Sequence, residues 1–187
     1  PDSARLSYVG HTLESPYGPT TLDDIYIWDA ATDETTRVLT DLDREPGSSV
    51  IADARYGVPM QRPQWTADGS RNVTLISDSG CVDLVACPTS PGERTILAGG
   101  NRDIHSFTLA QDGRVAFAAS TFNEPAEVFV LSPEGDEIRI TSHNATYCAN
   151  VEFAGVEELW FESDPGVQVQ GWLLHPPDFA AHVTYPA

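Results

Sequence analysis

Hydrophobic and polar residues alternate along most of this chain in short runs, and Gly, Pro, Asp and Asn separate the runs. Strict alternation predicts half-buried β-strands, because successive side chains of a strand point to opposite faces. Helical spacing is nearly absent, and only short pieces such as 179–183 could form a turn of helix. The pattern predicts an all-β protein built from antiparallel hairpins.

The alternation contains an internal repeat. Residues 63–80 align with residues 105–121, so that Trp65 and Asp68-Gly69 match Phe107 and Asp112-Gly113. The two Asp residues are 44 positions apart. Asp-Gly between two alternating runs favours a tight hairpin, since Gly accepts the positive φ that the turn requires. The chain therefore repeats a hairpin with a period of about 44 residues.

Partner strands repeat as well. The stretches 24–40, 82–98 and 126–141 each read as an apolar strand, a turn and an Arg-bearing strand, and they close on Thr40, Ala98 and Thr141. The last two closing residues are 43 apart, but the first two are 58 apart, which predicts an insertion of about 14 residues, placed most simply in 41–57.

A repeat of this length holding four short strands is typical of a β-propeller blade. A β-sandwich could use similar strands, but it has no reason to repeat turn residues at this interval. The chain holds about three and a half such units, whereas propellers usually close with about four to eight blades. We therefore expect a partial β-propeller of four-stranded antiparallel blades, as a fragment or as one of two pieces that assemble.

The net charge of −18 arises from 28 acidic and 10 basic residues, and every basic residue is Arg. A nucleic acid is excluded as an expected partner, because binding to phosphates needs clustered positive charge. The acidity favours solubility, or alternatively a field that attracts cationic peptides. Neither an apolar run long enough to span a membrane nor a signal-peptide pattern is present, so no membrane partner is expected.

Three cysteines, Cys81, Cys87 and Cys148, fit neither a disulfide framework nor a zinc pattern. On one strand Cys81 and Cys87 would lie roughly 20 Å apart, too far for a disulfide. Reduced, buried thiols and a cytoplasmic location are expected. Asn72-Val73-Thr74 and Asn144-Ala145-Thr146 match the glycosylation pattern, although two matches in a chain of this size are close to chance.

The C-terminal part carries an ordered series of motifs after the repeated Asp-Gly turns. The residues of this series are Ile140, Thr141 and Asn144, then Phe161, Ser163, Asp164 and Gly166, then Gly171, Trp172, Leu173, Pro176 and Phe179, then Tyr185 and Pro186. With the Glu-Val-Phe-Val-Leu and Glu-Leu-Trp-Phe-Glu strands, this order resembles the prolyl oligopeptidase family of serine peptidases, and most nearly its acylaminoacyl-peptidase branch. Pro165 and Gln111 depart from the family pattern, but both fall in turns that tolerate them.

The resemblance implies that residues 1–156 form the C-terminal half of a propeller. It implies that residues 157–187 form a linker and the first strand of an α/β-hydrolase domain, with Val167–Leu174 as that strand and Pro176-Pro177 at its end. The family's Ser, Asp and His would then lie beyond Ala187, and no Gly-x-Ser-x-Gly elbow occurs in this chain. We expect no catalytic residue, metal or cofactor on this chain, and its substrate-binding residues stay open.

The function implied by the resemblance is that of a propeller segment that admits short peptides to a catalytic domain outside this chain. The expected partners are that catalytic segment and the remaining blades, in the same chain or a separate one, together with short peptides and a possible homo-oligomer. The alternative is a non-enzymatic propeller that acts as a binding module or scaffold. Whether this chain counts as an enzyme depends on that missing segment.

Other candidate sites are weaker. His105 beside Ser106 cannot form a dyad, because neighbouring strand residues point to opposite faces. His143 is expected to form hydrogen bonds at a blade rim, and the remaining histidines, His11, His175 and His182, show no metal-ligand spacing. The stretch 41–45 resembles the start of a calcium loop, but Pro46 and Ala52 occupy its glycine and acidic positions.

The aromatic residues Trp65, Phe107 and Phe153 recur near expected strand starts and predict packing between blades. Trp28, Trp160 and Trp172 lie in apolar strands, so no aromatic cage is predicted from them. The insertion near 43–61 carries Arg44, Arg55 and Arg62 and is a candidate recognition loop, since long loops on rigid scaffolds often bind ligands. Simple variation in loop length is the alternative.

Overall fold

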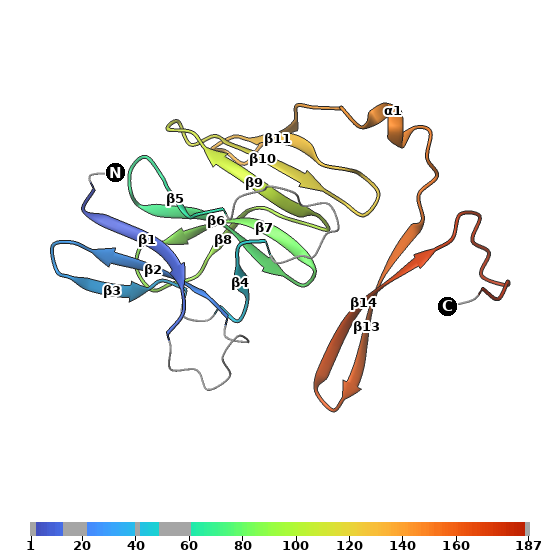
Figure 1. Ribbon diagram of the computed structural model, residues 1–187, viewed down its shortest axis with the longest axis horizontal. Helices are drawn as coiled ribbons and strands as arrows, with labels where there is room; N and C mark the ends of the chain where they lie inside the picture. Colours follow the sequence, from blue (N-terminus) through green and yellow to red (C-terminus); the bar gives the residue numbers. More distant parts are fainter. Residues whose placement is uncertain (1–2, 13–21, 40–41, 49–60, 186–187) are drawn as a thin grey trace.

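The computed structural model describes residues 3–12, 22–39, 42–48 and 61–185 (Figure 1). Nearly all regular structure in these ranges is β-strand, and the short helix α1 spans Ala145–Cys148. The strands form three antiparallel units, which we call the first, second and third blade, followed by a separate hairpin. The second and third units belong to one sheet, because Val82 and Asp103 form a parallel pairing between them. No helix within the described ranges is long and apolar enough to cross a membrane.

The first blade is a three-stranded sheet in the described residues. Its strands, in the order β1-β2-β3, are β1 (Arg5–Gly10), β2 (Asp24–Asp29) and β3 (Glu34–Arg37). Tyr8 and Tyr26 lie opposite each other in the β1-β2 register, and their rings stack with centroids 5.5 Å apart. Asp33 adopts a φ of +56° in the β2-β3 turn and accepts a hydrogen bond of 3.0 Å from Nε1 of Trp28.

The second and third blades are complete four-stranded meanders. The second contains β5 (Gln64–Trp65), β6 (Arg71–Asp78), β7 (Cys81–Pro88) and β8 (Thr95–Ala98), and the third contains β9 (Asp103–Leu109), β10 (Val115–Ser120), β11 (Glu127–Leu131) and β12 (Glu137–Arg139). Each strand pairs with the next in sequence. Gly69 and Gly113 adopt φ values of +67° and +87° in the equivalent turns, as the Asp-Gly repeat predicts.

The insertion interrupts a strand. Strand β4 (Glu45–Pro46) pairs with β6 through Pro46 and Ile76, and β5 pairs with the same edge of β6 through Gln64 and Val73. The register runs in one direction through both, so β4 and β5 are two parts of one edge strand. The extra residues therefore lie between 46 and 64, somewhat later than the 41–57 expected from the repeat. Ala52 and Arg55, singled out in the sequence, lie outside the described residues.

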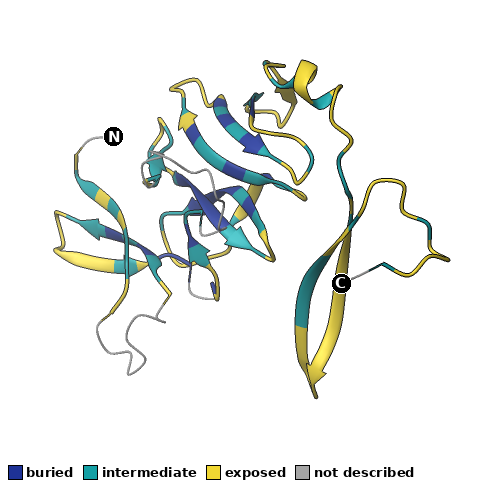
Figure 2. Ribbon diagram, turned by 45° about the vertical axis from the view of Figure 1, so that its right-hand side comes forward, coloured by how far each residue is buried: buried dark blue, intermediate teal, exposed yellow. Residues whose placement is uncertain are grey.

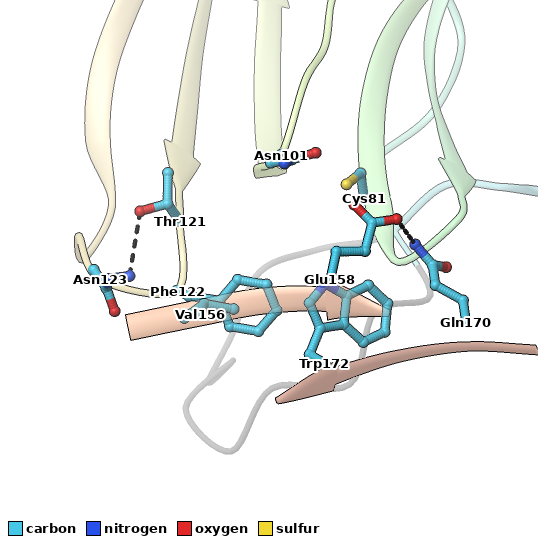
Figure 3. A pocket seen from close by; sticks show the side chains of 9 residues that line it. All are labelled: Cys81, Asn101, Thr121, Phe122, Asn123, Val156, Glu158, Gln170 and Trp172. Carbon is cyan, nitrogen blue, oxygen red and sulfur yellow. Dashed lines mark hydrogen bonds between the residues drawn. The ribbon is translucent and has the colours of Figure 1, made fainter. Parts of the chain in front are cut away.

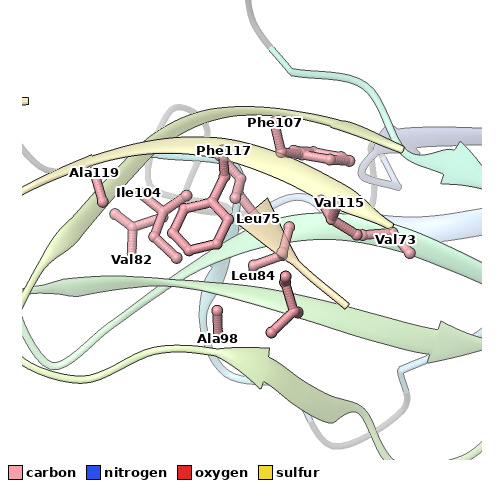
Figure 4. Packing of buried hydrophobic residues seen from close by; sticks show 11 residues of the cluster. Val73, Leu75, Val82, Leu84, Ala98, Ile104, Phe107, Val115, Phe117 and Ala119 are labelled. Atoms are coloured by element: carbon pink, nitrogen blue, oxygen red, sulfur yellow. The ribbon is translucent and has the colours of Figure 1, made fainter. Parts of the chain in front are cut away.

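Apolar side chains on both faces of the second blade form the core. One cluster lies between the second and third blades, and it comprises Val73, Leu75, Val82, Leu84, Ala98, Ile104, Phe107, Val115, Phe117, Ala119 and Leu131 (Figure 4). The other lies between the first and second blades, and it comprises Ile25, Ile27, Val38, Leu39, Leu42, Ile76, Val85 and Cys87. Strands β6 and β7 are therefore buried on both faces (Figure 2). Open antiparallel sheets packed in this way confirm the predicted all-β fold and fit part of a propeller.

The three aromatic residues expected between blades have different surroundings. Trp65 packs against the cluster of the first and second blades, and Phe107 is buried between the second and third, although it lies in the middle of β9. The expectation for Phe153 is wrong. It lies outside any strand, half-buried, with its ring edge-on to Tyr147 at 6.2 Å. The reason is that the last strand pair begins at Gly155, after α1 and its connection.

The last two strands form a two-stranded sheet of their own, which we call the C-terminal hairpin. It consists of β13 (Gly155–Asp164) and β14 (Val167–His175), joined by a turn in which Gly166 has a φ of +82°. Strand β14 begins at Val167 and ends directly before Pro176-Pro177, where the sequence predicts a strand end. The predicted domain boundary at 156/157 falls within β13, and residues 179–183 form turns, not a helix.

Candidate functional site

A pocket of about 180 Å³ lies between the C-terminal hairpin and the ends of the second and third blades (Figure 3). It is lined by Cys81, Asn101, Thr121, Phe122, Asn123, Val156, Glu158, Gln170 and Trp172. A second hollow shares Cys81, Asn101, Thr121 and Phe122 and extends the space toward Arg102, Asp103 and Ser120. We call the first of these, the pocket of about 180 Å³, the hairpin pocket, and the second hollow adjoins it.

Four chain segments supply the wall. Cys81 follows the tight β6-β7 turn, Asn101 lies in the β8-β9 connection, and Phe122 lies in the β10-β11 connection. On the hairpin, Glu158 lies opposite Trp172 and Trp160 lies opposite Gln170, so these four side chains share the face turned to the blades. The pocket therefore combines residues that are far apart in the sequence.

Close packing at Gly80 fixes the hairpin against the second blade. Gly80 has a φ of +71°, and a Cβ atom there would lie 2.1 Å from Cη2 of Trp172. The Trp172 ring also contacts Phe122, with centroids 5.9 Å apart and an interplanar angle of 44°. Gln170 Nε2 donates a hydrogen bond of 2.9 Å to the Ser79 carbonyl oxygen. Only glycine satisfies both the backbone conformation and the close approach of the indole.

The pocket carries negative charge. Glu158 Oε1 accepts hydrogen bonds from Gln170 Nε2 at 2.8 Å and from Trp160 Nε1 at 2.7 Å, and both donors are neutral. Burial raises the pKa of the nearby Cys81 thiol, and the carboxylates of Asp83 and Glu158 raise it further. Cys81 is therefore protonated at neutral pH and is a poor nucleophile.

A second constellation lies beside the pocket. Nε2 of His105 is 2.8 Å from Oγ of Ser120, and its Nδ1 is 3.4 Å from Oδ2 of Asp103. A β-bulge brings them together, since Ser106 pairs with Ala118 and Ile104 with Ala119, which leaves His105 as the extra residue on β9. The His-Asp distance exceeds the usual hydrogen-bond range of about 2.7–3.2 Å, which argues against an oriented catalytic triad. His105 contacts Ser120, a residue that the sequence did not single out.

Glu127 anchors the chain where it leaves the third blade toward the hairpin. Its buried carboxylate accepts hydrogen bonds from the Thr141 hydroxyl, from the His143 N–H at 3.2 Å and from the Asn144 N–H at 2.8 Å. The Thr141 hydroxyl, together with the Asn144 and His143 amides, lowers the pKa of Glu127 to about 2. His143 is exposed at this rim, and its backbone forms the hydrogen bond.

We expect Glu127→Gln to destabilise the fold at neutral pH and to reduce its dependence on pH. The pKa of Glu127 is depressed from 4.5 to about 2, so the stabilisation is fully present above pH 4.5 and is lost as the pH falls toward 2. Urea denaturation of the wild type and the variant between pH 7 and pH 3 should show a difference in stability that narrows with acidification. Glu124→Gln is the matched control, because Glu124 is exposed and contacts the same Arg139. A difference that stays constant over this range would contradict the assignment.

The other residues singled out in the sequence have structural surroundings. Arg44, which lies just before the inserted residues, pairs with Asp78 of the second blade at 2.7 Å, and Arg62 is exposed. Asn72 is fully buried and so cannot accept a glycan in the folded protein. The three cysteines are free thiols, with Cys87 buried and the other two half-buried. Of Trp28, Trp160 and Trp172, for which the sequence predicted no aromatic cage, Trp172 lines the pocket.

Proteins similar to this chain in sequence include peptidases. No family model matches the sequence. An uncharacterized peptidase of Bacillus subtilis, YuxL, is 26% identical over 92% of this chain and 26% of its own length. A probable dipeptidyl-peptidase 5 of Aspergillus niger is also 26% identical, over 100% of this chain and 24% of its own length. This chain therefore spans about a quarter of the length of these relatives.

Solved structures share the fold. The acylaminoacyl peptidase of Pyrococcus horikoshii superposes with a TM-score of 0.70 and 22% identity over 94% of this chain and 24% of its own. An acylaminoacyl peptidase in complex with Z-Gly-Gly-Phe-chloromethyl ketone gives a TM-score of 0.72 and 22% identity over 99% of this chain and 25% of its own. In each case the superposition covers nearly the whole of this chain.

Proposed function

We propose that this chain, which is related to peptidases of the prolyl oligopeptidase family, is the propeller segment of a serine peptidase and the first strand of its catalytic domain. The observation that carries the proposal is that peptidase relatives match nearly the whole chain with about a quarter of their own length. The blades would line the access path to the catalytic domain and allow short peptides to reach it. Residues 1–156 would belong to the propeller and residues 157–187 to the linker and that first strand.

The C-terminal hairpin offers a surface for the catalytic segment. Leu159, Phe161 and Leu173 lie on the hairpin face that is turned away from the pocket, and they are 38%, 54% and 46% exposed. A contiguous exposed apolar face of this kind is typical of a surface that another domain covers. The proposed partners are therefore the catalytic α/β-hydrolase segment on this face and the remaining blades, with short peptides as the substrates. The free thiols favour a reducing compartment such as the cytoplasm.

A serine-reactive phosphonate probe tests the proposal on the full-length protein. We expect the probe to label one serine that lies outside residues 1–187 of this chain, and the labelling to be prevented by prior heating. Mass spectrometry of the labelled peptide identifies the residue. If no serine is labelled in the full-length protein or in any chain that copurifies with it, the peptidase proposal fails and a non-enzymatic propeller is the better description.

A further inference from the structure

Glu158 holds an unneutralised charge at the edge of the hairpin pocket. Arg102, which lines the adjoining hollow, is already paired with Glu137 at 2.6 Å. The two groups that do bind the Glu158 carboxylate, the Gln170 amide and the Trp160 indole, are neutral and use one of its oxygens, Oε1. A carboxylate can accept several more hydrogen bonds, so Oε2 offers a place for a charged donor.

Two aromatic rings stand beside this carboxylate. Trp172 and Phe122 come from β14 and the β10-β11 connection, and their tilted rings form one wall of the pocket (Figure 3). The face of an aromatic ring attracts a cation through its quadrupole, most strongly for Trp. The polar groups of Asn101, Thr121 and Asn123 complete the lining. The wall therefore suits a group that carries positive charge on an apolar stem.

The size and the negative charge of the pocket limit the kinds of ligand that fit it. A volume of about 180 Å³ accommodates the end of one side chain, since a water molecule takes about 30 Å³ of liquid volume. The negative field is also felt at the Cys81 thiol, whose pKa is raised first by burial and then by carboxylates that include Glu158. Glu158 is exposed, so water solvates its carboxylate, but only a cationic ligand would gain an ion pair with it.

We infer that the hairpin pocket binds an organic monocation, a primary ammonium or guanidinium group, with Glu158 as the counter-ion and Trp172 and Phe122 as the aromatic wall. The inference rests on the proposed function only in naming a short peptide as the source of that cation. The group could be a basic side chain or the free amino terminus of the peptide, because both present the same chemistry to the pocket.

Ligand-observed NMR titration of the full-length protein tests the inference without using hydrolysis. Nα-acetyl-lysinamide is compared with its neutral counterpart Nα-acetyl-norleucinamide, and leucinamide is compared with Nα-acetyl-leucinamide. We expect at least one cationic probe to bind about tenfold more tightly than its neutral counterpart, as one charge-assisted hydrogen bond would provide. The first pair reports a basic side chain and the second pair reports a free amino terminus.

Two isosteric variants locate the cation. Glu158→Gln keeps the oxygen that Gln170 and Trp160 bind but removes the charge, and we expect it to abolish the tenfold preference. Glu157→Gln is the matched control, because this substitution removes the same charge from the other face of β13. Glu157 contacts His175 there at 3.0 Å. Equal affinity for cationic and neutral probes in the wild type, or equal loss in both variants, would overturn the inference. If the wild-type protein binds the cationic probes more tightly but the phosphonate labels no serine in it, only the peptidase proposal is overturned.

Discussion

Replacing Gly80 with alanine is expected to release the C-terminal hairpin from the second blade and to lower the free energy of unfolding by about 2–4 kcal/mol. Two costs combine. An L-residue at a φ of +71° costs about 1–2 kcal/mol, and the new methyl group would overlap the Trp172 ring, which lies 2.1 Å from its position. Hydrogen exchange of residues 167–175 and urea denaturation of the full-length protein measure the local and the global effect.

Gly166→Ala separates the two costs. Gly166 has a φ of +82°, but nothing lies within 4 Å of the position where its Cβ would be. We expect this variant to show the backbone cost alone and to leave exchange at the β6-β7 turn unchanged. Combining Gly80→Ala with Trp172→Ala should recover the part of the loss that comes from overlap, because the double-mutant cycle isolates that contact. Equal effects of Gly80→Ala and Gly166→Ala would show that the indole does not pack on this turn.

Phe117→Ala is expected to destabilise the protein by about 3–5 kcal/mol, the range for removing a buried phenylalanine ring. Phe117 is 2% exposed and lies in the cluster between the second and third blades. Its ring stacks on Phe129 with centroids 5.4 Å apart, and the Arg102 guanidinium lies 5.2 Å from its centroid. Arg102 in turn binds Glu137 through two hydrogen bonds of 2.6 and 2.7 Å. Urea denaturation followed by far-ultraviolet circular dichroism gives the change.

Phe129→Ala provides the comparison for this prediction. Phe129 is the stacking partner of Phe117 and also lies under Arg102, at 5.6 Å, but it is only partly buried. Phe129→Ala should therefore lower the free energy of unfolding clearly less than Phe117→Ala does, since less apolar surface returns to water and a smaller cavity is left. Equal losses would mean that the aromatic stack with Arg102, and not the packing between the blades, determines the stability of this region.

The parts of the fold that depend on local chemistry were predictable from the sequence. The sequence predicts hairpins at Asp68-Gly69 and Asp112-Gly113, because glycine is suited to a positive φ. Both turns occur where the repeat places them. The alternation around Val73 and Leu75 and the mostly apolar run 82–87 identify two strands before their partners are known. The end of β14 before Pro176-Pro177 follows from the missing N–H of proline.

The hairpin pocket could not be predicted in the same way. Its wall comes from connections between the blade strands and from the C-terminal hairpin, which are far apart in sequence, as the contact between Gln170 and Ser79, 91 positions apart, shows. The bulge that leaves His105 beside Ser120 depends on how β9 and β10 align, and alternation does not encode one extra residue. Gly80 was the available signal, since a glycine after Ser79 marks a tight turn, but nothing in the sequence indicates that an indole covers it.

The divided edge strand of the second blade has a consequence for how this chain can change. Pro46 and Gln64 are held at nearby positions of one edge, opposite Ile76 and Val73, so the entry and exit of the intervening segment are fixed by hydrogen bonds to a buried strand. Closing a longer loop between fixed ends costs little, because the entropy of closure grows only with the logarithm of length. Residues can therefore be gained or lost there while every blade keeps its place, which makes this edge a natural position for diversification among relatives and for grafting a binding peptide.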